Sequence, residues 1–220
     1  MKVRMKSEDR RAAIVRSAIH LFAEKGFRGA TTRELASAAG VTEPVLYQHF
    51  RAKSDLYRAI IEAKAAEVSE HAVDLQQAAR SNDDRAFFRM VGELILRRYQ
   101  TDPELTRLLF FSALERHELA DLFFERLYSG FYQLVAGYIR RRIREGAFRK
   151  TSPDIAARSL VGMLSYHGQQ TLLFPARFKL TQRRRIVEET VDLFLGGIAG
   201  PNPGAVRPPS DSTALSNSPE

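Results

Sequence analysis

The chain has 220 residues and a net charge of +8 at pH 7. It contains no Cys, which excludes disulfides, thiolate zinc sites and Cys nucleophiles and suits a reducing compartment. No apolar run approaches the roughly 20 residues that span a bilayer, and the polar start MKVRMKSEDRR does not read as a signal peptide. We therefore expect a soluble protein of the cytoplasm.

The positive charge is concentrated in the first quarter of the chain. Residues 1–53 hold eleven Lys or Arg against five Asp or Glu, whereas residues 54–220 hold 23 against 21. A concentrated basic surface attracts polyanions such as nucleic acid, and it would also suit an anionic membrane.

Apolar residues recur with a period near 3.6 along the chain and strand signals are almost absent, which predicts an all-α fold. The first helix begins near Ser7, and Gly26 followed by Phe27 resembles a helix stop. The second helix opens with Thr31 and Glu34 at capping-box spacing and ends at Gly40. A short third helix follows it.

Capping residues, Gly and Pro also divide the rest of the chain into helices. The predicted ranges are 54–79, 85–100, a start at 101–103, 117–145, 152–173, and a last helix capped by Thr181 and ended by Gly196 and Gly197. The Pro- and Ser-rich end predicts a disordered tail. The predicted domains are 1–53, 54–198 and the tail 199–220.

The second and third helices have the pattern of a helix-turn-helix unit. Leu35, Leu46 and Phe50 can close a three-helix core against the first helix, and Gly40 permits a tight turn between the two helices. Such a turn holds the third helix away from the body, where it can enter a DNA major groove.

The segment GFRGATTRELASAAGVTEPVLYQHFRAKSDLY resembles the DNA-binding head of the tetracycline-repressor (TetR) family of bacterial regulators. The matched features are GF after the first helix, TT-x-x-L-A, the A-x-x-x-G-V turn, and L-Y-x-H-F followed by K-x-x-L. The motifs cover about the first 57 residues, and the likeness in number of helices extends to about residue 198.

The resemblance implies a DNA-binding set in this head. Groove-rim positions are Thr32 and Arg33, base-reading positions are Glu43, Pro44 and Val45, phosphate positions are Tyr47, His49 and Lys53, and Thr42 and Gln48 complete the set. Glu43 departs from the pattern, because a carboxylate can accept from cytosine N4 but also opposes phosphates. Alternatively, His49 caps the short helix and Tyr47 packs against the first helix.

Aromatic residues are dense between residues 85 and 174, and family members usually hold an inducing ligand in this region. The resemblance therefore implies a small apolar or aromatic effector. The candidate ligand residues are Phe88, Phe110, Phe111, His117, Phe124, Tyr128, Tyr166, His167 and Gln170. The alternative is that this aromatic stripe is core.

The last two helices have the pattern of a homodimer surface, with apolar residues in one seam and small residues that permit close approach. The candidates are Ala156, Ser159, Gly162, Val187, Thr190, Val191 and Phe194. The alternative is an intramolecular core for the same residues, and the two are compatible. The nearby run Arg140, Arg141, Arg142 and Arg144 is interpreted as a solvated face.

The patterns together predict a ligand-responsive, homodimeric DNA-binding regulator, a repressor released from a palindromic operator. We expect no catalysis, cofactor or metal, since the five His are dispersed and the sequence offers no evident further residue to complete a metal site or a hydrolytic dyad with Glu67 and His71. The alternative is a helical small-molecule-binding protein without sequence-specific DNA activity.

Overall fold

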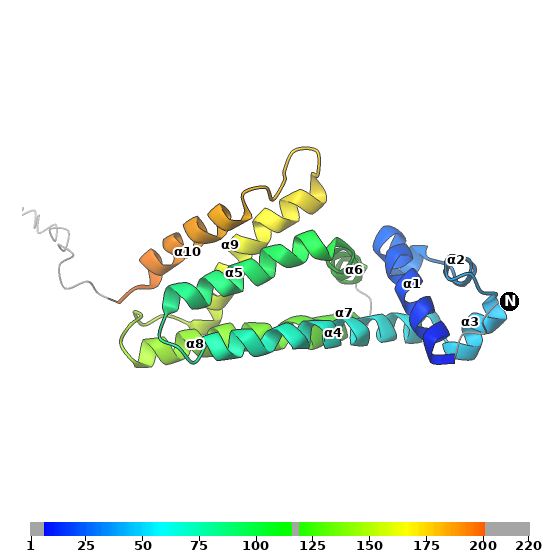
Figure 1. The fold of residues 1–220 in the computed structure, drawn as a ribbon, viewed down its shortest axis with the longest axis horizontal. Coiled ribbons are helices and arrows are strands. Elements are labelled where there is room, and N and C mark those ends of the chain that lie inside the picture. The colour runs from blue at the N-terminus through cyan, green and yellow to red at the C-terminus, as the bar shows by residue number, and fades with distance from the viewer. Residues whose placement is uncertain (1–6, 116–118, 201–220) are drawn as a thin grey trace, which may run out of the picture.

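The computed structural model describes residues 7–115 and 119–200, apart from the side chains of residues 68–72 and 119. These residues fold into helices, which confirms the all-α prediction, and the extended pairing among them is one isolated bridge between Phe148 and Ala199. Figure 1 shows an elongated molecule with a small helical head at one end and a longer helical body. None of the described helices is long and apolar enough to cross a membrane.

The head consists of α1 (Ser7–Gly29), α2 (Thr32–Ala38) and α3 (Glu43–His49). The regular geometry of α1 breaks at the predicted stop, where Gly26 has a φ of 72° that side chains with a Cβ rarely adopt. The predicted capping box is present, because Glu34 N donates to Thr31 Oγ1 at 3.3 Å and Thr31 N donates to Glu34 Oε2 at 2.9 Å. A hydrogen bond from Lys25 and those from Thr31 lower the pKa of Glu34 to about 2.

The body begins with α4 (Lys53–Ala78), which runs out of the head along the lower edge of the molecule in Figure 1. The remaining elements are α5 (Asp84–Thr101), α6 (Pro103–Leu114), α7 (Leu119–Phe124), the π-helical segment η1 (Glu125–Ser129), α8 (Gly130–Arg144), α9 (Pro153–Leu173) and α10 (Arg183–Ile198). In Figure 1, α6 is seen end-on at the junction with the head.

Three predicted helix limits were wrong. The single helix expected over 117–145 is divided among α7, η1 and α8, because residues 125–129 take π-helical hydrogen bonding. Gln182, and not Thr181, occupies the cap position of α10, and this helix continues through its two Gly to Ile198.

The first two residues of the predicted tail are held in place, since Gly200 N donates to the carbonyl of Ala147 at 3.0 Å. Residues 201–220 lie outside the described part.

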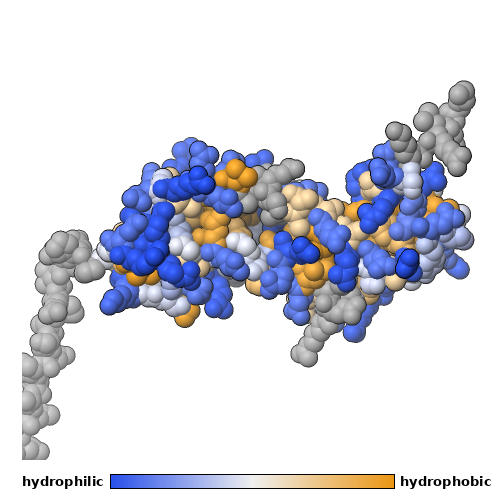
Figure 2. Space-filling model, turned by 90° about the horizontal axis from the view of Figure 1, so that it is seen from below, coloured by the Kyte–Doolittle hydropathy of each residue, from blue (hydrophilic) through white to orange (hydrophobic). Residues whose placement is uncertain are grey.

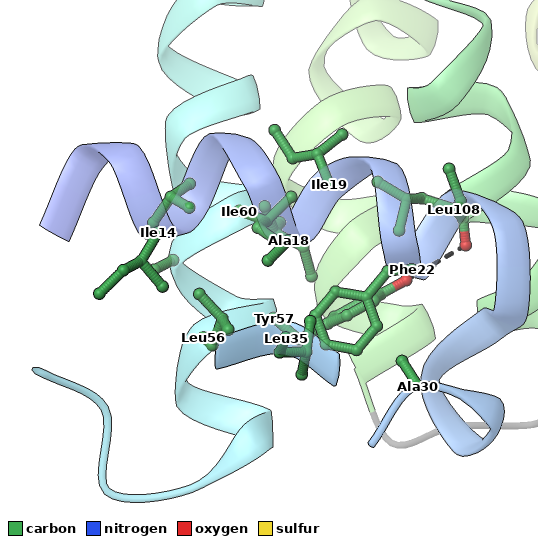
Figure 3. Close-up of a cluster of buried hydrophobic side chains, with 14 of the residues drawn as sticks. Ile14, Ala18, Ile19, Phe22, Ala30, Leu35, Leu56, Tyr57, Ile60 and Leu108 are labelled. Carbon is green, nitrogen blue, oxygen red and sulfur yellow. Dashed lines mark hydrogen bonds between the residues drawn. The ribbon is translucent and has the colours of Figure 1, made fainter. Parts of the chain in front are cut away.

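One apolar core joins the head to the first part of the body. Figure 3 shows Phe22 of α1, Leu35 of α2 and Tyr57 of α4 pointing toward one another. Phe22 and Leu35 have no exposed surface, and the rings of Phe22 and Tyr57 meet edge to face with centroids 5.0 Å apart. The Tyr57 hydroxyl donates to the carbonyl of Leu108 in α6 at 3.2 Å and is hydrogen-bonded to Ser112. Packing is therefore continuous across residue 53, and the predicted division of domains at that position stays a prediction.

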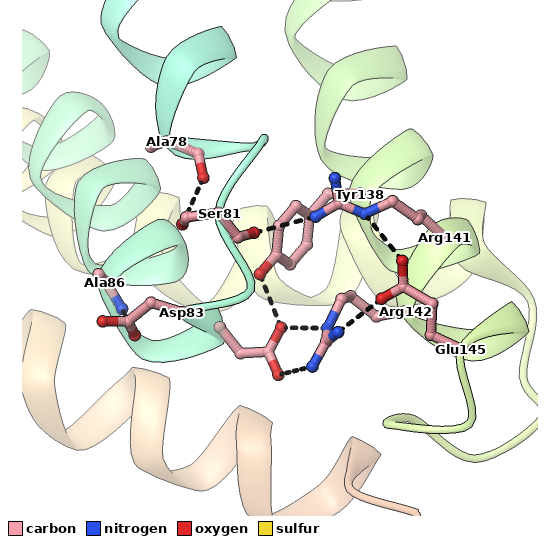
Figure 4. A network of polar contacts seen from close by, with 9 residues as sticks. Ala78, Ser81, Asp83, Ala86, Tyr138, Arg141, Arg142 and Glu145 are labelled. Atoms are coloured by element: carbon pink, nitrogen blue, oxygen red, sulfur yellow. Dashed lines mark hydrogen bonds and ion pairs between the residues drawn. The ribbon is translucent and has the colours of Figure 1, made fainter.

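A second core lies between α5, α8, α9 and α10, and a polar network closes its end. The carboxylate of Asp84 accepts hydrogen bonds from Tyr138 Oη at 2.7 Å and from Arg142 Nε at 2.8 Å. Figure 4 shows the Tyr138 and Arg142 side chains of this network. Burial and this hydrogen bond both raise the pKa of Tyr138. The Arg142 side chain is only 12% exposed, so the prediction of a solvated arginine face was wrong at this position. Arg141 also turns inward and donates from Nη2 to the carbonyl of Ser81 at 3.0 Å.

Candidate nucleic-acid interface and ligand region

One face of α3 packs against the rest of the head, and the opposite face is exposed to solvent. Leu46 and Phe50 are each 3% exposed and belong to the head core. The turn before α3 is closed by the hydrogen bond from Val41 N to the carbonyl of Ala36 at 3.0 Å, and Gly40 has a φ of 66°. Two short helices joined by this turn have the helix-turn-helix arrangement that the sequence predicted.

The outer face of this unit carries most of the predicted DNA-binding residues. Exposed side chains are Arg33, Thr42, Pro44, Tyr47 and Gln48, and partly buried ones are Thr32, Glu43, Val45, His49 and Lys53. Tyr47 is 48% exposed and lies with Thr32 and Lys53 around a small hollow between α2, α3 and the start of α4. The structure therefore brings Thr32, Tyr47 and Lys53 of the predicted set together around this hollow.

The side chain of Glu43 forms a hydrogen bond within the protein. Its Oε1 accepts a hydrogen bond from Thr32 Oγ1 at 2.7 Å, which links the first turn of α3 to the first turn of α2. The sequence pattern placed Glu43 among base-reading residues and Thr32 at the groove rim. In the structure the two side chains are instead hydrogen-bonded to each other, so this pair helps to orient α3 on α2.

Lys53 is also engaged inside the protein. Its Nζ donates to the carbonyls of Phe27 at 2.6 Å and Ala30 at 2.9 Å, and it lies 4.4 Å from the centre of the Phe27 ring. Burial lowers the pKa of this lysine. Two of its three donors thus close the end of α1, which the motif did not predict, and one donor is left for a phosphate.

The predicted ligand residues do not form one site. Phe88 has no exposed surface and packs in the body core against Tyr138, Phe148 and Phe194, so its assignment to a ligand cavity was wrong. Phe111 lies at the junction with the head, where its ring is a near neighbour of Gly26.

The other candidates divide between the interior of the body and its surface. Phe124 and Tyr128 stack with ring centroids 6.5 Å apart, and Phe110 is half-buried. Tyr166 and His167 are exposed on α9, and Gln170 beside them is half-buried. His117 lies outside the described residues.

Two further residues join the stacked pair and were missed from the sequence. Tyr132 stacks on Phe124 at 6.2 Å, and Arg98 lies over the ring of Tyr128 with Cζ 5.6 Å from its centre. The spacing of Phe124, Tyr128 and Tyr132 at four-residue intervals was the available signal, since such residues share one helix face. No local pattern distinguished Arg98 from the exposed Arg97 beside it.

The predicted homodimer residues mostly face inward. Ala156, Val187, Thr190, Val191 and Phe194 are at most 8% exposed and are buried within a single chain, as the alternative of an intramolecular core predicted; a part for them in a dimer interface stays a prediction. Ser159 and Gly162 are exposed. On the same outward side of α9 and α10, the exposed apolar side chains are Ile155, Met163, Tyr166, Leu173 and Leu193.

The face of the molecule seen from below is mixed in hydropathy. Figure 2 shows blue side chains over the head and the body, with orange side chains in separate patches between them. The exposed large apolar residues include Phe174 and Phe178 in the segment between α9 and α10.

Comparisons with known proteins agree with both parts of this arrangement. Residues 14–60 match the family model of bacterial regulatory proteins of the tetR family, and residues 85–197 match that of the C-terminal domain of AefR-like transcriptional repressors.

Individual relatives match shorter stretches. The HTH-type transcriptional activator FasR of Mycolicibacterium smegmatis is 32% identical over 49% of this chain and 48% of its own length. The class A tetracycline repressor from transposon 1721 in Escherichia coli is 44% identical over 32% of this chain and 31% of its own. The chain thus spans about half the length of the first relative and less of the second.

A solved structure extends the likeness of fold. The crystal structure of a tetR-family regulator from Mesorhizobium loti superposes with a TM-score of 0.69 and 20% identity, covering 89% of this chain and 100% of that one. The family models cover the head and more than half of the chain, and the fold agrees with them throughout. The chain belongs to the tetR family of bacterial regulatory proteins.

Proposed function

We propose that the protein is a homodimeric transcriptional repressor that binds a palindromic operator through α3 and is released by a small effector with an apolar or aromatic body. The supporting observation is the geometry of α3, which is anchored by Leu46 and Phe50 while Pro44, Tyr47 and Gln48 are exposed. A helix held in this way can place side chains on base edges in a major groove. A regulator of bacterial genes works where the DNA is, so we propose the cytoplasm as its location.

The proposed dimer uses the outward face of α9 and α10. Ile155, Ser159, Gly162 and Tyr166 fall at helical spacing on α9, and all four are exposed. Large exposed apolar side chains beside small ones permit a second copy to pack closely against this face. A dimer with a two-fold axis at this face would carry two heads, one for each half-site of a palindromic operator.

The proposed effector response passes through contacts between α6 and the head. Glu104 Oε1 is 2.8 Å from His20 Nδ1, and the Glu115 carboxylate accepts from Arg28 N at 3.3 Å. Asp102 Oδ2 forms an ion pair with Lys64 of α4 at 2.8 Å, while its Oδ1 caps α6 by accepting from Leu105 N. A ligand that shifts α6 or α4 would therefore move the head, and typical couplings of about 1–3 kcal/mol change affinity by roughly 5–150-fold.

Selection of bound sites from a random DNA library tests this function. We expect a palindrome whose half-sites are about one helical turn apart, or a multiple of it, and a dimer in analytical ultracentrifugation. Gln48→Ala should change the selected sequence, whereas the matched Gln133→Ala on the exposed side of α8 should not. A monomer that binds DNA tightly one-to-one would contradict the proposal. A protein that selects no sequence would have to be assigned to the helical small-molecule-binding alternative.

A further inference from the structure

Three tyrosines lie near one another in the body, and the ring of one of them, Tyr128, contacts Arg98. Tyr128 and Tyr132 come from η1 and α8, and Tyr99 comes from the last turn of α5, next to Arg98. The ring of Tyr99 lies directly over Gly168 of α9, where a Cβ would collide with it. The cluster is therefore assembled from α5, from the contiguous elements η1 and α8, and from α9.

Arg98 has no carboxylate partner within ion-pair distance among the described residues. Its guanidinium is half-buried and contacts the Tyr128 ring. Two other arginines of the body that are not exposed do have a carboxylate partner, Arg142 with Asp84 at 2.8 Å and Arg183 with Glu93 at 2.8 Å. A partly desolvated cation without a counter-charge is unfavourable, and an anion supplied from outside would relieve that cost.

The tyrosines around Arg98 remain neutral donors. Burial raises the pKa of Tyr128 to about 12, and burial also raises the pKa of Tyr99 and Tyr132. No hydrogen bond of the Tyr128 hydroxyl is formed among the described residues. A guanidinium next to protonated phenols offers several N–H and O–H donors to one small acceptor group, and the planar guanidinium matches a carboxylate.

An apolar surface continues from these donors toward solvent. Phe124 stacks on both Tyr128 and Tyr132, and 45% of its surface is exposed. Tyr128 itself lies in the π-helical segment, and such segments are frequent at functional sites. A ligand with a charged group at Arg98 could thus place an apolar body against Phe124.

We propose that Arg98, with the hydroxyl of Tyr128, binds the carboxylate of a small organic acid whose acyl or aryl body lies along Phe124. This inference rests on the proposed function, because it names the chemical class of the effector. The acid would also lie near the ion pair between Asp102 and Lys64, which connects the start of α6 to α4. Asp102 is one helical turn after Arg98, and its backbone N donates to the Arg98 carbonyl at 2.8 Å.

Matched pairs of an acid and its primary amide test the carboxylate directly. Octanoate with octanamide, and 2-naphthoate with 2-naphthamide, are titrated by calorimetry into the full-length protein. We expect at least one acid to bind about 10- to 100-fold more tightly than its amide, the range of a hydrogen bond to a charged group. Inorganic phosphate should not saturate the site over the same concentrations.

Variants identify the residue responsible. Arg98→Met should reduce the preference for acid over amide to about twofold or less, whereas Arg97→Met, an equal change at the exposed neighbour, should keep it. Circular dichroism checks that each variant is folded. If Arg98→Met fails to fold, Tyr128→Phe gives the same comparison, with an expected decrease of about fivefold in the preference.

Three results would overturn the proposal: no saturable binding of either acid at millimolar concentration, equal binding of acid and amide, or a full preference in folded Arg98→Met. Operator binding is measured separately on the same preparations. A protein that binds its operator but no acid refutes the carboxylate site alone. A protein that prefers the acid but selects no DNA sequence retains the site and refutes the regulator.

Discussion

The hydrogen bond between Thr32 and Glu43 allows positioning of α3 to be separated from base reading. In Glu43→Gln the amide oxygen can still accept from Thr32, but a negative charge near the DNA is removed. At about 8 Å in water, one charge–phosphate repulsion amounts to about 0.5 kcal/mol, and two heads double this value. We therefore expect Glu43→Gln to bind the operator roughly fivefold more tightly at low salt, with unchanged base preference.

Glu43→Ala removes the same charge and also the acceptor. Loss of one hydrogen bond of this kind costs about 1 kcal/mol in each head, hence about 2 kcal/mol in the dimer. This loss exceeds the electrostatic gain of about 1 kcal/mol, so Glu43→Ala should bind roughly fivefold more weakly than wild type. The two substitutions are thus expected to act with opposite sign.

Fluorescence anisotropy with the selected operator and its single-base variants measures both effects, and Glu24→Gln on the exposed side of α1 serves as the control for charge alone. A change of base preference in Glu43→Gln would show that Glu43 reads a base directly. If Glu43→Gln and Glu43→Ala changed affinity in the same direction and by the same amount, the hydrogen bond to Thr32 would have no role in orienting α3.

Three other substitutions have defined outcomes. Lys53→Met removes two charge-assisted bonds to carbonyls and should lower the free energy of unfolding by about 2 kcal/mol in urea denaturation, while flattening the salt dependence of DNA binding by about 1 per half-site. Asp84→Asn leaves Arg142 partly unpaired at a largely buried site and should cost about 2–3 kcal/mol in the same assay, against less than about 1 kcal/mol for Arg140→Met, whose ion pair is exposed. Leu193→Asp puts a charge on the exposed face of α10 and should yield folded monomers in ultracentrifugation.

Each of these outcomes can be contradicted separately. Unchanged stability of Lys53→Met would mean that its carbonyl contacts contribute nothing to the fold, and an unchanged salt slope would exclude a phosphate contact. Equal losses in Asp84→Asn and Arg140→Met would remove the distinction between the buried and the exposed pair. A Leu193→Asp variant that remains dimeric would place the interface elsewhere.

Local features were predictable because neighbouring residues determine them. The capping box of Thr31 and Glu34 depends on a spacing of three residues, and the interruption at Gly26 depends on a conformation that favours Gly. The helix-turn-helix unit followed from the same kind of local signal and from its motif. The wrong helix limits lie at η1 and at the start of α10. At η1 π-helical hydrogen bonding replaces the expected α-helix, and at α10 the neighbouring Gln182 takes the cap position expected for Thr181.

Contacts between distant segments were less predictable. A periodic apolar seam shows that one helix face is covered, but it does not show whether the same chain or a second copy covers it. For this reason the sequence left a dimer interface and an intramolecular core both open for Val187 and Phe194, and the structure shows that they are buried within a single chain. Likewise, a motif placed Lys53 near the DNA but could not indicate that the carbonyls of Phe27 and Ala30 take up two of its donors. The role proposed for Arg98 depends on its having no carboxylate partner in the described part of the chain, which the sequence alone could not indicate.

Asp102 combines two tasks in one carboxylate, since one oxygen caps α6 and the other pairs with Lys64 of α4. The two tasks are separable by genetics, because Asn can still cap a helix but cannot form the ion pair. Alleles that keep the gene silent in the presence of effector should accordingly include Asp102→Asn and uncharged replacements of Lys64. Such alleles would leave the surface of α3 untouched and fold normally, so a screen for permanently repressed colonies would map the connection between body and head from the phenotype alone.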